Sequence, residues 1–209
     1  EAYVPVPWLT ALAEQNGVLR VQTIIPPQAA VTSQGAALHR SAIWSARGFT
    51  GAGVKVGVID GGFIGYSALM GTELPATVVA RCYIAVGVHT STVANCESNT
   101  VHGAGVAEAV VDIAPGASLY IANPISNGDL QSTAAWMTSQ GVTVINASLG
   151  FAWDGPGNGT SPFSNSPLKT VDSAVAGGAI WANSAGNEGP SNWYGLYSDS
   201  NSDGWLEFT

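Results

Sequence analysis

Charged residues are scarce in this chain, and basic residues are the scarcest. Of its 209 residues only 10% are charged, and 6 Lys and Arg stand against 14 Asp and Glu, which gives a net charge of −8. Nucleic acids and anionic membrane surfaces are bound through clusters of basic side chains. We therefore expect neither nucleic acid nor a membrane as a partner.

Long apolar runs are also missing, although 46% of the residues are hydrophobic. A helix needs about 20 consecutive apolar residues to cross a bilayer, and no run reaches that length. Residues 1–5 lack the basic start and apolar core of a signal peptide. Low charge with many Ser, Thr, Asn and Gly residues is typical of extracellular proteins, so we expect a secreted protein whose signal has already been removed.

Cysteine is limited to Cys82 and Cys96. A disulfide between them would stabilise the fold by about 3 kcal/mol on the chain-entropy estimate, and we favour it over two free buried thiols. The three histidines are scattered and do not cluster with the cysteines, so the sequence has no zinc-type spacing. We expect the protein to require no cofactor.

The chain does contain a regular alternation of strand and helix patterns. Residues 54–60 are predicted to form a buried parallel strand that ends in a carboxylate, Asp60. Other strands are predicted at 78–84, 118–122, 142–146 and 178–182, and helices at 36–44, 102–112, 129–139 and 167–176. Such alternation predicts an α/β fold with a mostly parallel sheet and helices on both of its faces.

The first 30 residues are predicted to be separate from this sheet. Residues 8–14 have helical apolar spacing, and residues 18–25 alternate loosely like a strand before Pro26-Pro27 breaks the pattern. We expect residues 1–30 to form a small helix-strand appendage and residues 31–209 to form the main domain.

Polar residues next to the predicted strands and helices are the candidates for chemistry. In open α/β sheets catalytic groups gather at the carboxyl ends of the strands, where Asp60 lies. His102 begins a predicted helix, where a histidine can face a strand-end carboxylate that fixes its tautomer. Asn187 follows a strand, and its amide is suited to donate to an oxyanion. The backbone from Ser148 to Gly150 follows another strand and is suited to pair with an extended peptide.

Four short motifs, taken together, resemble the subtilisin-like serine protease family. They are Val-Gly-Val-Ile-Asp-Gly-Gly around Asp60, His-Gly-Ala-Gly-Val-Ala from His102, Ser-Leu-Gly from Ser148, and Ala-Gly-Asn-Glu-Gly around Asn187. Each motif alone is weak, but their order and spacing match the family over about residues 31–190. The resemblance implies a three-layer sandwich, with residues 1–30 similar to the tail of a propeptide and residues 31–209 as the N-terminal part of a catalytic domain.

The resemblance also implies roles in the hydrolysis of a peptide or protein substrate through an acyl-enzyme. Asp60 would orient the imidazole, His102 would act as general base, and Asn187 would stabilise the tetrahedral intermediate. Glu188 would lie at the rim of the specificity pocket and favour a basic side chain. The other implied residues are Ser148, Leu149 and Gly150 for binding of the substrate backbone, and Ser184, Ala185 and Gly186 for the wall of the pocket.

The sequence departs from the family pattern in its nucleophile. The family motif Gly-Thr-Ser-Met/Phe-Ala-x-Pro does not follow Asn187, and the Gly-Thr-Ser that ends at Ser161 comes too early and opens no apolar helix. We therefore expect the serine to lie beyond Thr209, in a C-terminal remainder of the same protease, and this chain alone to be inactive. Smaller departures are Gly61 and Ala104, which replace hydroxyl residues without removing a catalytic atom.

Other interpretations fit part of the pattern. The same fold without a nucleophile would serve as a non-catalytic peptide-binding or assembly module. A nucleotide-binding domain that uses residues 57–65 is disfavoured, because the full dinucleotide glycine pattern is missing after the strand. Asp199, Asn201 and Asp203 are spaced as in calcium loops, so a structural calcium ion is the alternative to an ordinary polar turn there.

Overall fold

The fold is taken from a computed structural model of the chain. The described residues are 11, 14–15, 34–150, 159–186 and 198–202. The chain divides into two compact units, Glu1–Val31 and Thr32–Thr209. The helix and strand predicted within residues 1–30 lie almost wholly outside the described residues, and the nature of that appendage stays a prediction.

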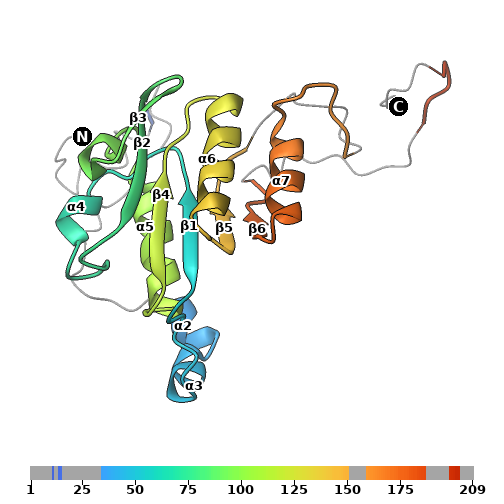
Figure 1. Cartoon of the computed structure of the whole chain (residues 1–209). Coiled ribbons are helices and arrows are strands. Elements are labelled where there is room, and N and C mark those ends of the chain that lie inside the picture. Colours follow the sequence, from blue (N-terminus) through green and yellow to red (C-terminus); the bar gives the residue numbers. More distant parts are fainter. Residues whose placement is uncertain (1–10, 12–13, 16–33, 151–158, 187–197, 203–209) are drawn as a thin grey trace. The chain divides into compact units, whose positions relative to one another are not determined.

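A six-stranded sheet lies at the centre of the second unit (Figure 1). Its strands are β1 (Lys55–Ile59), β2 (Val79–Ala85), β3 (Val88–Thr90), β4 (Ser118–Ala122), β5 (Val144–Ala147) and β6 (Ile180–Asn183), in the spatial order β3-β2-β4-β1-β5-β6. Every neighbouring pair is parallel except the hairpin of β2 and β3. The predicted mostly parallel sheet is confirmed, and β3 is an additional strand that the sequence pattern did not predict.

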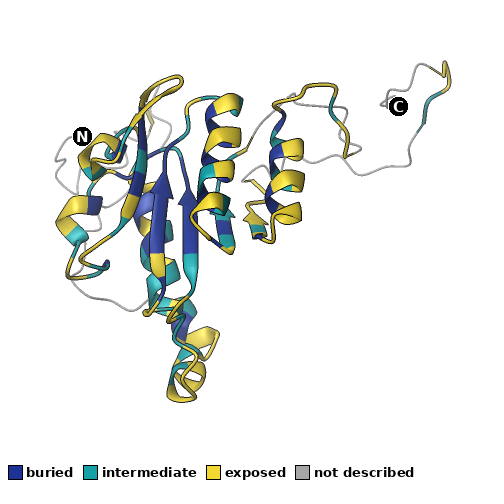
Figure 2. Ribbon diagram, viewed as in Figure 1, coloured by how far each residue is buried: buried dark blue, intermediate teal, exposed yellow. Residues whose placement is uncertain are grey.

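Helices cover both faces of this sheet. Residues of α5 (His102–Ile113) pack against one face, and residues of α6 (Asn127–Ser139) and α7 (Pro167–Ala176) pack against the other. The near-continuous apolar sequences of β1 and β4 are therefore buried on both sides, as Figure 2 shows. The short helices are α2 (Gln34–Leu38), α3 (Ser41–Ala46), α4 (Tyr66–Leu69) and the 3₁₀ helix η2 (Val93–Cys96). The three-layer α/β sandwich is confirmed.

Two helix predictions differ from the structure for local reasons. Helix α6 begins at Asn127 rather than 129, because Ser126 and Asp129 form a capping box in which each side chain accepts the other's backbone N–H at 3.1 Å. The single helix predicted at 36–44 is wrong. The chain turns at Arg40, whose φ is +54°, and forms α2 and α3 instead.

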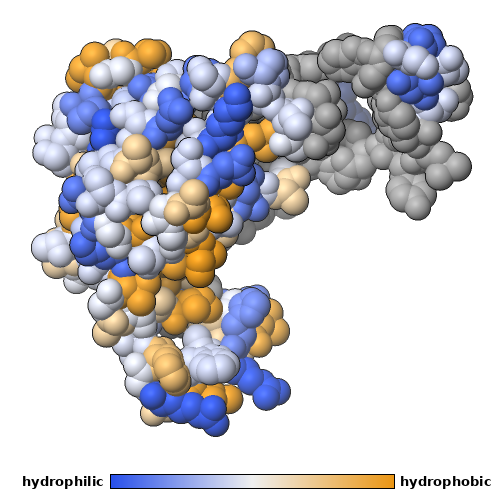
Figure 3. All heavy atoms as spheres, turned by 45° about the vertical axis from the view of Figure 1, so that its right-hand side comes forward, coloured by the Kyte–Doolittle hydropathy of each residue, from blue (hydrophilic) through white to orange (hydrophobic). Residues whose placement is uncertain are grey.

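Large apolar side chains are exposed around α2 and α3. They are Leu38, Ile43, Trp44 and Phe49. Trp44 and Phe49 pack edge to face with ring centroids 6.0 Å apart, and Figure 3 shows apolar and hydrophilic side chains intermingled over this part of the surface. None of the helices in the described part of the chain is long and apolar enough to cross a membrane.

Cys82 and Cys96 form a disulfide, as predicted. Both residues are fully buried and belong to the apolar cluster on the α5 face of the sheet. The bond joins β2 to η2, and it therefore ties one side of the sheet to the segment that leads into α5.

Tyr66 in α4 is fully buried, and its hydroxyl has no hydrogen-bond partner among the described residues. Burial raises the pKa of Tyr66, because the phenolate cannot be solvated there. An unsatisfied buried hydroxyl costs folding free energy, so we expect Tyr66→Phe to raise the free energy of unfolding by about 1 kcal/mol. Urea unfolding measures this change.

Tyr83→Phe is the matched control for that variant. The Tyr83 hydroxyl donates to the Asp129 carbonyl oxygen and accepts from Thr133 Oγ1, each at 3.2 Å. Removing it breaks two buried hydrogen bonds, so this variant should lose stability. A loss of equal size in Tyr66→Phe would show that the Tyr66 hydroxyl is satisfied in solution.

Glu108 on α5 interacts with two other carboxylates, Glu73 and Asp112. Partial burial, and then repulsion from these two groups, raises the pKa of Glu108. The stability contributed by protonated Glu108 is fully present below its unfolded pKa of about 4.5, and it is lost as pH rises through the higher folded pKa. We expect Glu108→Gln to raise the Tm at about pH 7 and much less at about pH 4. Thermal unfolding at both pH values tests this, and an equal rise at both would contradict it.

Candidate active site

Asp60 directly follows β1, the strand between β4 and β5. Its side chain is buried, with 2% of the residue exposed, and its backbone N–H donates to the Ala122 carbonyl oxygen at 3.1 Å. Asp60 Oδ1 accepts a hydrogen bond from Gly61 N at 2.8 Å. The carboxylate is therefore held at the carboxyl edge of the sheet, where the sequence predicted it.

His102 is the first residue of α5, and its ring faces Asp60. Nδ1 lies 2.7 Å from Asp60 Oδ2, while 58% of the His102 side chain is exposed. An ionised carboxylate only accepts hydrogen bonds, so Nδ1 carries the proton in this pair and Nε2 of the neutral ring keeps its lone pair. The ring can therefore take up a proton at Nε2 while Asp60 holds it at Nδ1.

Hydrogen bonds join the start of α5 to the loop that follows Asp60. Gly103 N donates to the Gly62 carbonyl oxygen at 3.0 Å. Asn99 has a left-handed backbone, with φ of +63°, and its side-chain amide donates to the Gly61 carbonyl oxygen at 3.1 Å. The separation of acid and base is thus set by direct contacts between their two backbone segments.

Two other predicted segments reach the same edge of the sheet. Ser148 follows β5 and its N–H donates to the Ile59 carbonyl oxygen at 3.3 Å, and Ser184 follows β6 and its N–H donates to the Ala147 carbonyl oxygen at 3.2 Å. Because β1, β5 and β6 are parallel neighbours, both segments start at the same edge as Asp60. Ser148 and Leu149 are half-buried, and the exposed residues are Gly150, Ser184, Ala185 and Gly186.

The predicted oxyanion residue, Asn187, lies outside the described residues, and so does Glu188. In the sequence Asn187 directly follows Gly186, the last described residue after β6. Among the predicted site residues, Asp60 and His102 are in direct contact, and the other described ones begin at the same sheet edge. Their roles stay predictions.

Comparison with known proteins gives the family of this chain. Residues 51–207 match the Subtilase family. The chain belongs to the subtilase family. It is 34% identical over 157 residues to subtilisin DY of Bacillus licheniformis, a match that covers 70% of this chain and 52% of that protein. It is 34% identical over 158 residues to subtilisin E of Bacillus subtilis (strain 168), a match that covers 69% of this chain and 37% of that protein. It is 33% identical over 158 residues to subtilisin of Bacillus pumilus, a match that covers 69% of this chain and 51% of that protein. The chain thus spans about half or less of the length of these relatives.

The two small departures from the subtilase pattern leave the acid-base pair in place. The atoms nearest to a Cβ placed on Gly61 would be 3.9 Å away, so this position has room for the Cβ of another residue. Ala104 is buried in the first turn of α5. Asp60 accepts hydrogen bonds from Gly61 N and His102 Nδ1 without either hydroxyl.

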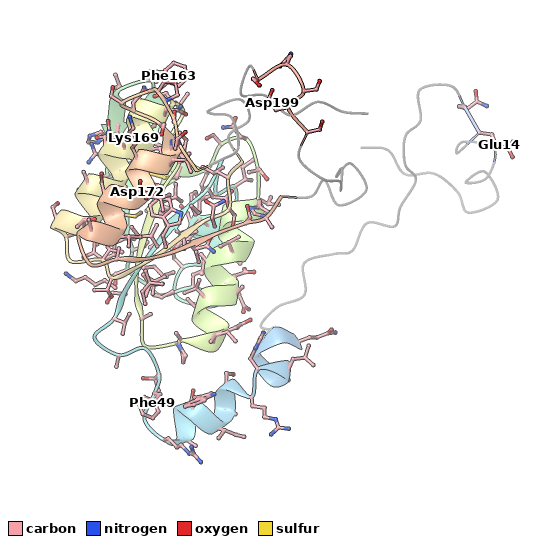
Figure 4. All side chains as sticks on the ribbon, turned by 90° about the vertical axis from the view of Figure 1, so that its right-hand side faces the viewer. Glu14, Phe49, Phe163, Lys169, Asp172 and Asp199 are labelled. Atoms are coloured by element: carbon pink, nitrogen blue, oxygen red, sulfur yellow. A yellow bond between two sulfur atoms is a disulfide. The ribbon has the colours of Figure 1, made fainter. Side chains whose placement is uncertain are left out.

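Ser161, the early serine of this subtilase chain, lies in the segment before α7. Its hydroxyl oxygen accepts from Phe163 N at 3.2 Å, and α7 begins only at Pro167. Figure 4 shows Phe163 ahead of α7 and Lys169 and Asp172 along that helix. The subtilase nucleophile opens a long helix, so this placement gives no support to Ser161 as the nucleophile.

Asn123 is a buried polar residue at the same edge that sequence reasoning did not single out. It follows β4 as Asp60 follows β1, and 3% of it is exposed. The signal that was available is a polar residue directly after the apolar run at 118–122. Its side chain bonds to the backbone of Tyr83 in β2.

Proposed function

We propose that this chain supplies part of the active site of a subtilisin-type serine endopeptidase. The observation that carries the proposal is the 2.7 Å contact between Asp60 Oδ2 and His102 Nδ1 at the carboxyl edge of the sheet in a subtilase chain. A buried carboxylate that orients an exposed imidazole is the arrangement that activates a serine hydroxyl.

In the proposed reaction His102 moves the proton and Asp60 stabilises the charge. A serine Oγ attacks the carbonyl carbon of the peptide bond while its proton passes to His102 Nε2, and the imidazolium is stabilised by ionised Asp60. His102 then gives this proton to the leaving amine nitrogen as the C–N bond breaks. Water hydrolyses the acyl-enzyme by the same two proton transfers.

The remaining predicted residues bind substrate or stabilise charge in this proposal. The Asn187 amide donates to the oxyanion, a contribution of about 3 to 4 kcal/mol where such a donor has been removed from a subtilisin. Glu188 favours a basic side chain at the rim of the pocket. The peptide-binding residues are Ser148, Leu149 and Gly150 along the substrate backbone, and Ser184, Ala185 and Gly186 along the pocket wall.

The nucleophile is proposed to lie beyond Thr209, in a C-terminal remainder of the same protease. The family's serine motif does not follow Asn187 in this sequence, and the matched relatives are longer than the chain. Secretion is also part of the proposal, because the disulfide of Cys82 and Cys96 would persist in an oxidising compartment. Structural calcium stays a prediction, since Asp203 lies outside the described residues.

A fluorophosphonate probe, applied to the intact natural protein, tests the proposed function. The reagent reacts covalently with a serine that a neighbouring base activates, so we expect one serine to be labelled in the folded protein and none after heat denaturation. Peptide mass spectrometry identifies that serine. Folded intact protein that is not labelled would overturn the proposal, and would favour the non-catalytic peptide-binding or assembly module.

A further inference from the structure

Asp60 and Asn123 occupy neighbouring positions at the ends of β1 and β4. The last paired residues of these strands are Ile59 and Ala122. Val58 of β1 and Ile121 of β4 belong to the apolar cluster on the α5 face. Side chains alternate between the two faces along a strand, so Asp60 and Asn123, each two residues further on, lie on that face as well. Buried Asn123 therefore follows β4 on the same face of the sheet on which Asp60, the acid that holds His102, follows β1.

The Asn123 amide connects β4 to β2 beyond the end of their regular pairing. That pairing stops at Arg81 and Ala122. One residue further along the chain from β4 and two residues further along β2, Asn123 Oδ1 accepts from Tyr83 N at 2.7 Å, and Nδ2 donates to the Tyr83 carbonyl oxygen at 3.4 Å. One side chain thus replaces backbone hydrogen bonds that a continued ladder would make.

The same amide holds the segment that leads to His102, residues 96–100. Asn123 Nδ2 donates to Ser98 Oγ at 3.4 Å. Asn123 Oδ1 also lies 3.6 Å from Cys96 Sγ, which is a contact rather than a hydrogen bond because the disulfide sulfur carries no proton. Residues 96–100 are therefore fixed to the sheet by one covalent bond and by one buried amide.

Residues 96–100 in turn lie against the loop that follows the acid. Phe63 N donates to the Cys96 carbonyl oxygen at 2.9 Å. The Ser98 carbonyl oxygen occupies the space that a Cβ on Gly62 would need. A shift of this segment would therefore move the imidazole that follows it relative to the carboxylate.

We propose that Asn123 is a positioning residue for the Asp60–His102 pair, because its buried amide holds residues 96–100 where they place His102 Nδ1 against Asp60. An apolar side chain of the same size would leave Tyr83 N without its acceptor and would release Ser98. This inference rests on the proposed function for its catalytic consequence, but the position of the ring can be measured without any reaction.

The proton on His102 Nδ1 is the reporter, observed by ¹H–¹⁵N NMR of the intact protein with labelled histidine and assigned with His102→Gln. The hydrogen bond to Asp60 slows exchange of this proton with water. We expect Asn123→Leu to speed that exchange about tenfold or more. Ser98→Ala removes only the hydroxyl that accepts from Asn123 Nδ2, and Ser98 is partly exposed, so we expect this variant to fold. It should also make exchange of the His102 Nδ1 proton faster.

Thr133→Val is the matched control. Thr133 is fully buried, and its hydroxyl donates to the Tyr83 hydroxyl at 3.2 Å from α6, on the other face of the sheet. This variant should lower stability and leave exchange at His102 unchanged. The inference would be overturned if the His102 Nδ1 proton exchanged as slowly in Asn123→Leu and Ser98→Ala as in the unsubstituted protein. It would also be overturned if exchange in Thr133→Val were as fast as in Asn123→Leu.

A peptide hydrolysis assay separates this inference from the proposed function. If exchange responds as expected but the intact unsubstituted protein is not labelled by the probe and cleaves no peptide, the inference holds and the proposed function fails. If the intact protein is active and Asn123→Leu keeps both its kcat and slow exchange, the inference alone fails. If the inference and the proposed function are both correct, Asn123→Leu lowers kcat about tenfold or more with little change in KM.

Discussion

Asp60→Asn is expected to lower kcat of the intact protein by about 10⁴-fold while the fold persists. Asp60 Oδ1 accepts from Gly61 N, so the oxygen of an asparagine would keep that place and its NH₂ group would face His102. That group only donates, so His102 Nδ1 would have to accept and the ring proton would move to Nε2. The nitrogen that should receive the serine proton would then already carry one.

Steady-state hydrolysis of a peptide by the intact protein measures this loss. His102→Ala removes the base itself, so its kcat shows how far activity falls when the base is absent. That kcat should fall by about 10⁶-fold, as known for a subtilisin. Asn and Asp have nearly the same shape, so the thermal unfolding temperature of Asp60→Asn should change little. A fall of less than about tenfold in Asp60→Asn would contradict the role of the carboxylate.

Gly62→Ala is expected to abolish activity and to lower the free energy of unfolding by about 3 kcal/mol. Its Cβ would overlap the Ser98 carbonyl oxygen, a backbone atom that cannot rotate away. Residues 96–100 would have to move, and His102 would move with them. One methyl group that touches neither the acid nor the base would thus separate the two.

Gly61→Ala is the matched control for this variant, one residue away. The nearest atoms to its Cβ would be side-chain carbons of Leu149 and Thr100 at 3.9 Å, which is ordinary contact distance, and its N–H would still reach Asp60. We expect its free energy of unfolding to stay within about 0.5 kcal/mol of the unsubstituted protein. Urea unfolding and peptide hydrolysis measure both variants, and equal losses in the two would rule out the steric explanation.

The main elements were predictable because their signals are local. Strand β4 was predicted at the residues where it lies, 118–122, and α7 at 167–176, where Pro167 follows the serine that caps the helix. Strand β3 could not be predicted in this way, because Val88–Thr90 is three residues long and mostly exposed, and so it shows no alternation.

The acid-base pair was predictable for the same reason, and the groups that position it were not. Asp60 ends an apolar strand and His102 begins a helix of small residues, so each is visible within its own element. Asn123 obeys the same strand-end rule, but its partners in residues 96–100 and in β2 are distant in the sequence. Gly62 likewise has no room for a side chain only because the backbone at Ser98, from another part of the sequence, lies against it. Contacts of this kind leave no periodic pattern.

The strand order has a consequence for how this protein is made. Strand β1 lies between β4 and β5, and both of these come later in the chain. On the ribosome β1 therefore emerges as an apolar strand with two open edges, long before either neighbour has been synthesised. Parallel pairing between distant segments also closes slowly. Until β5 leaves the exit tunnel, the nascent chain therefore presents an open apolar edge with which other chains can pair.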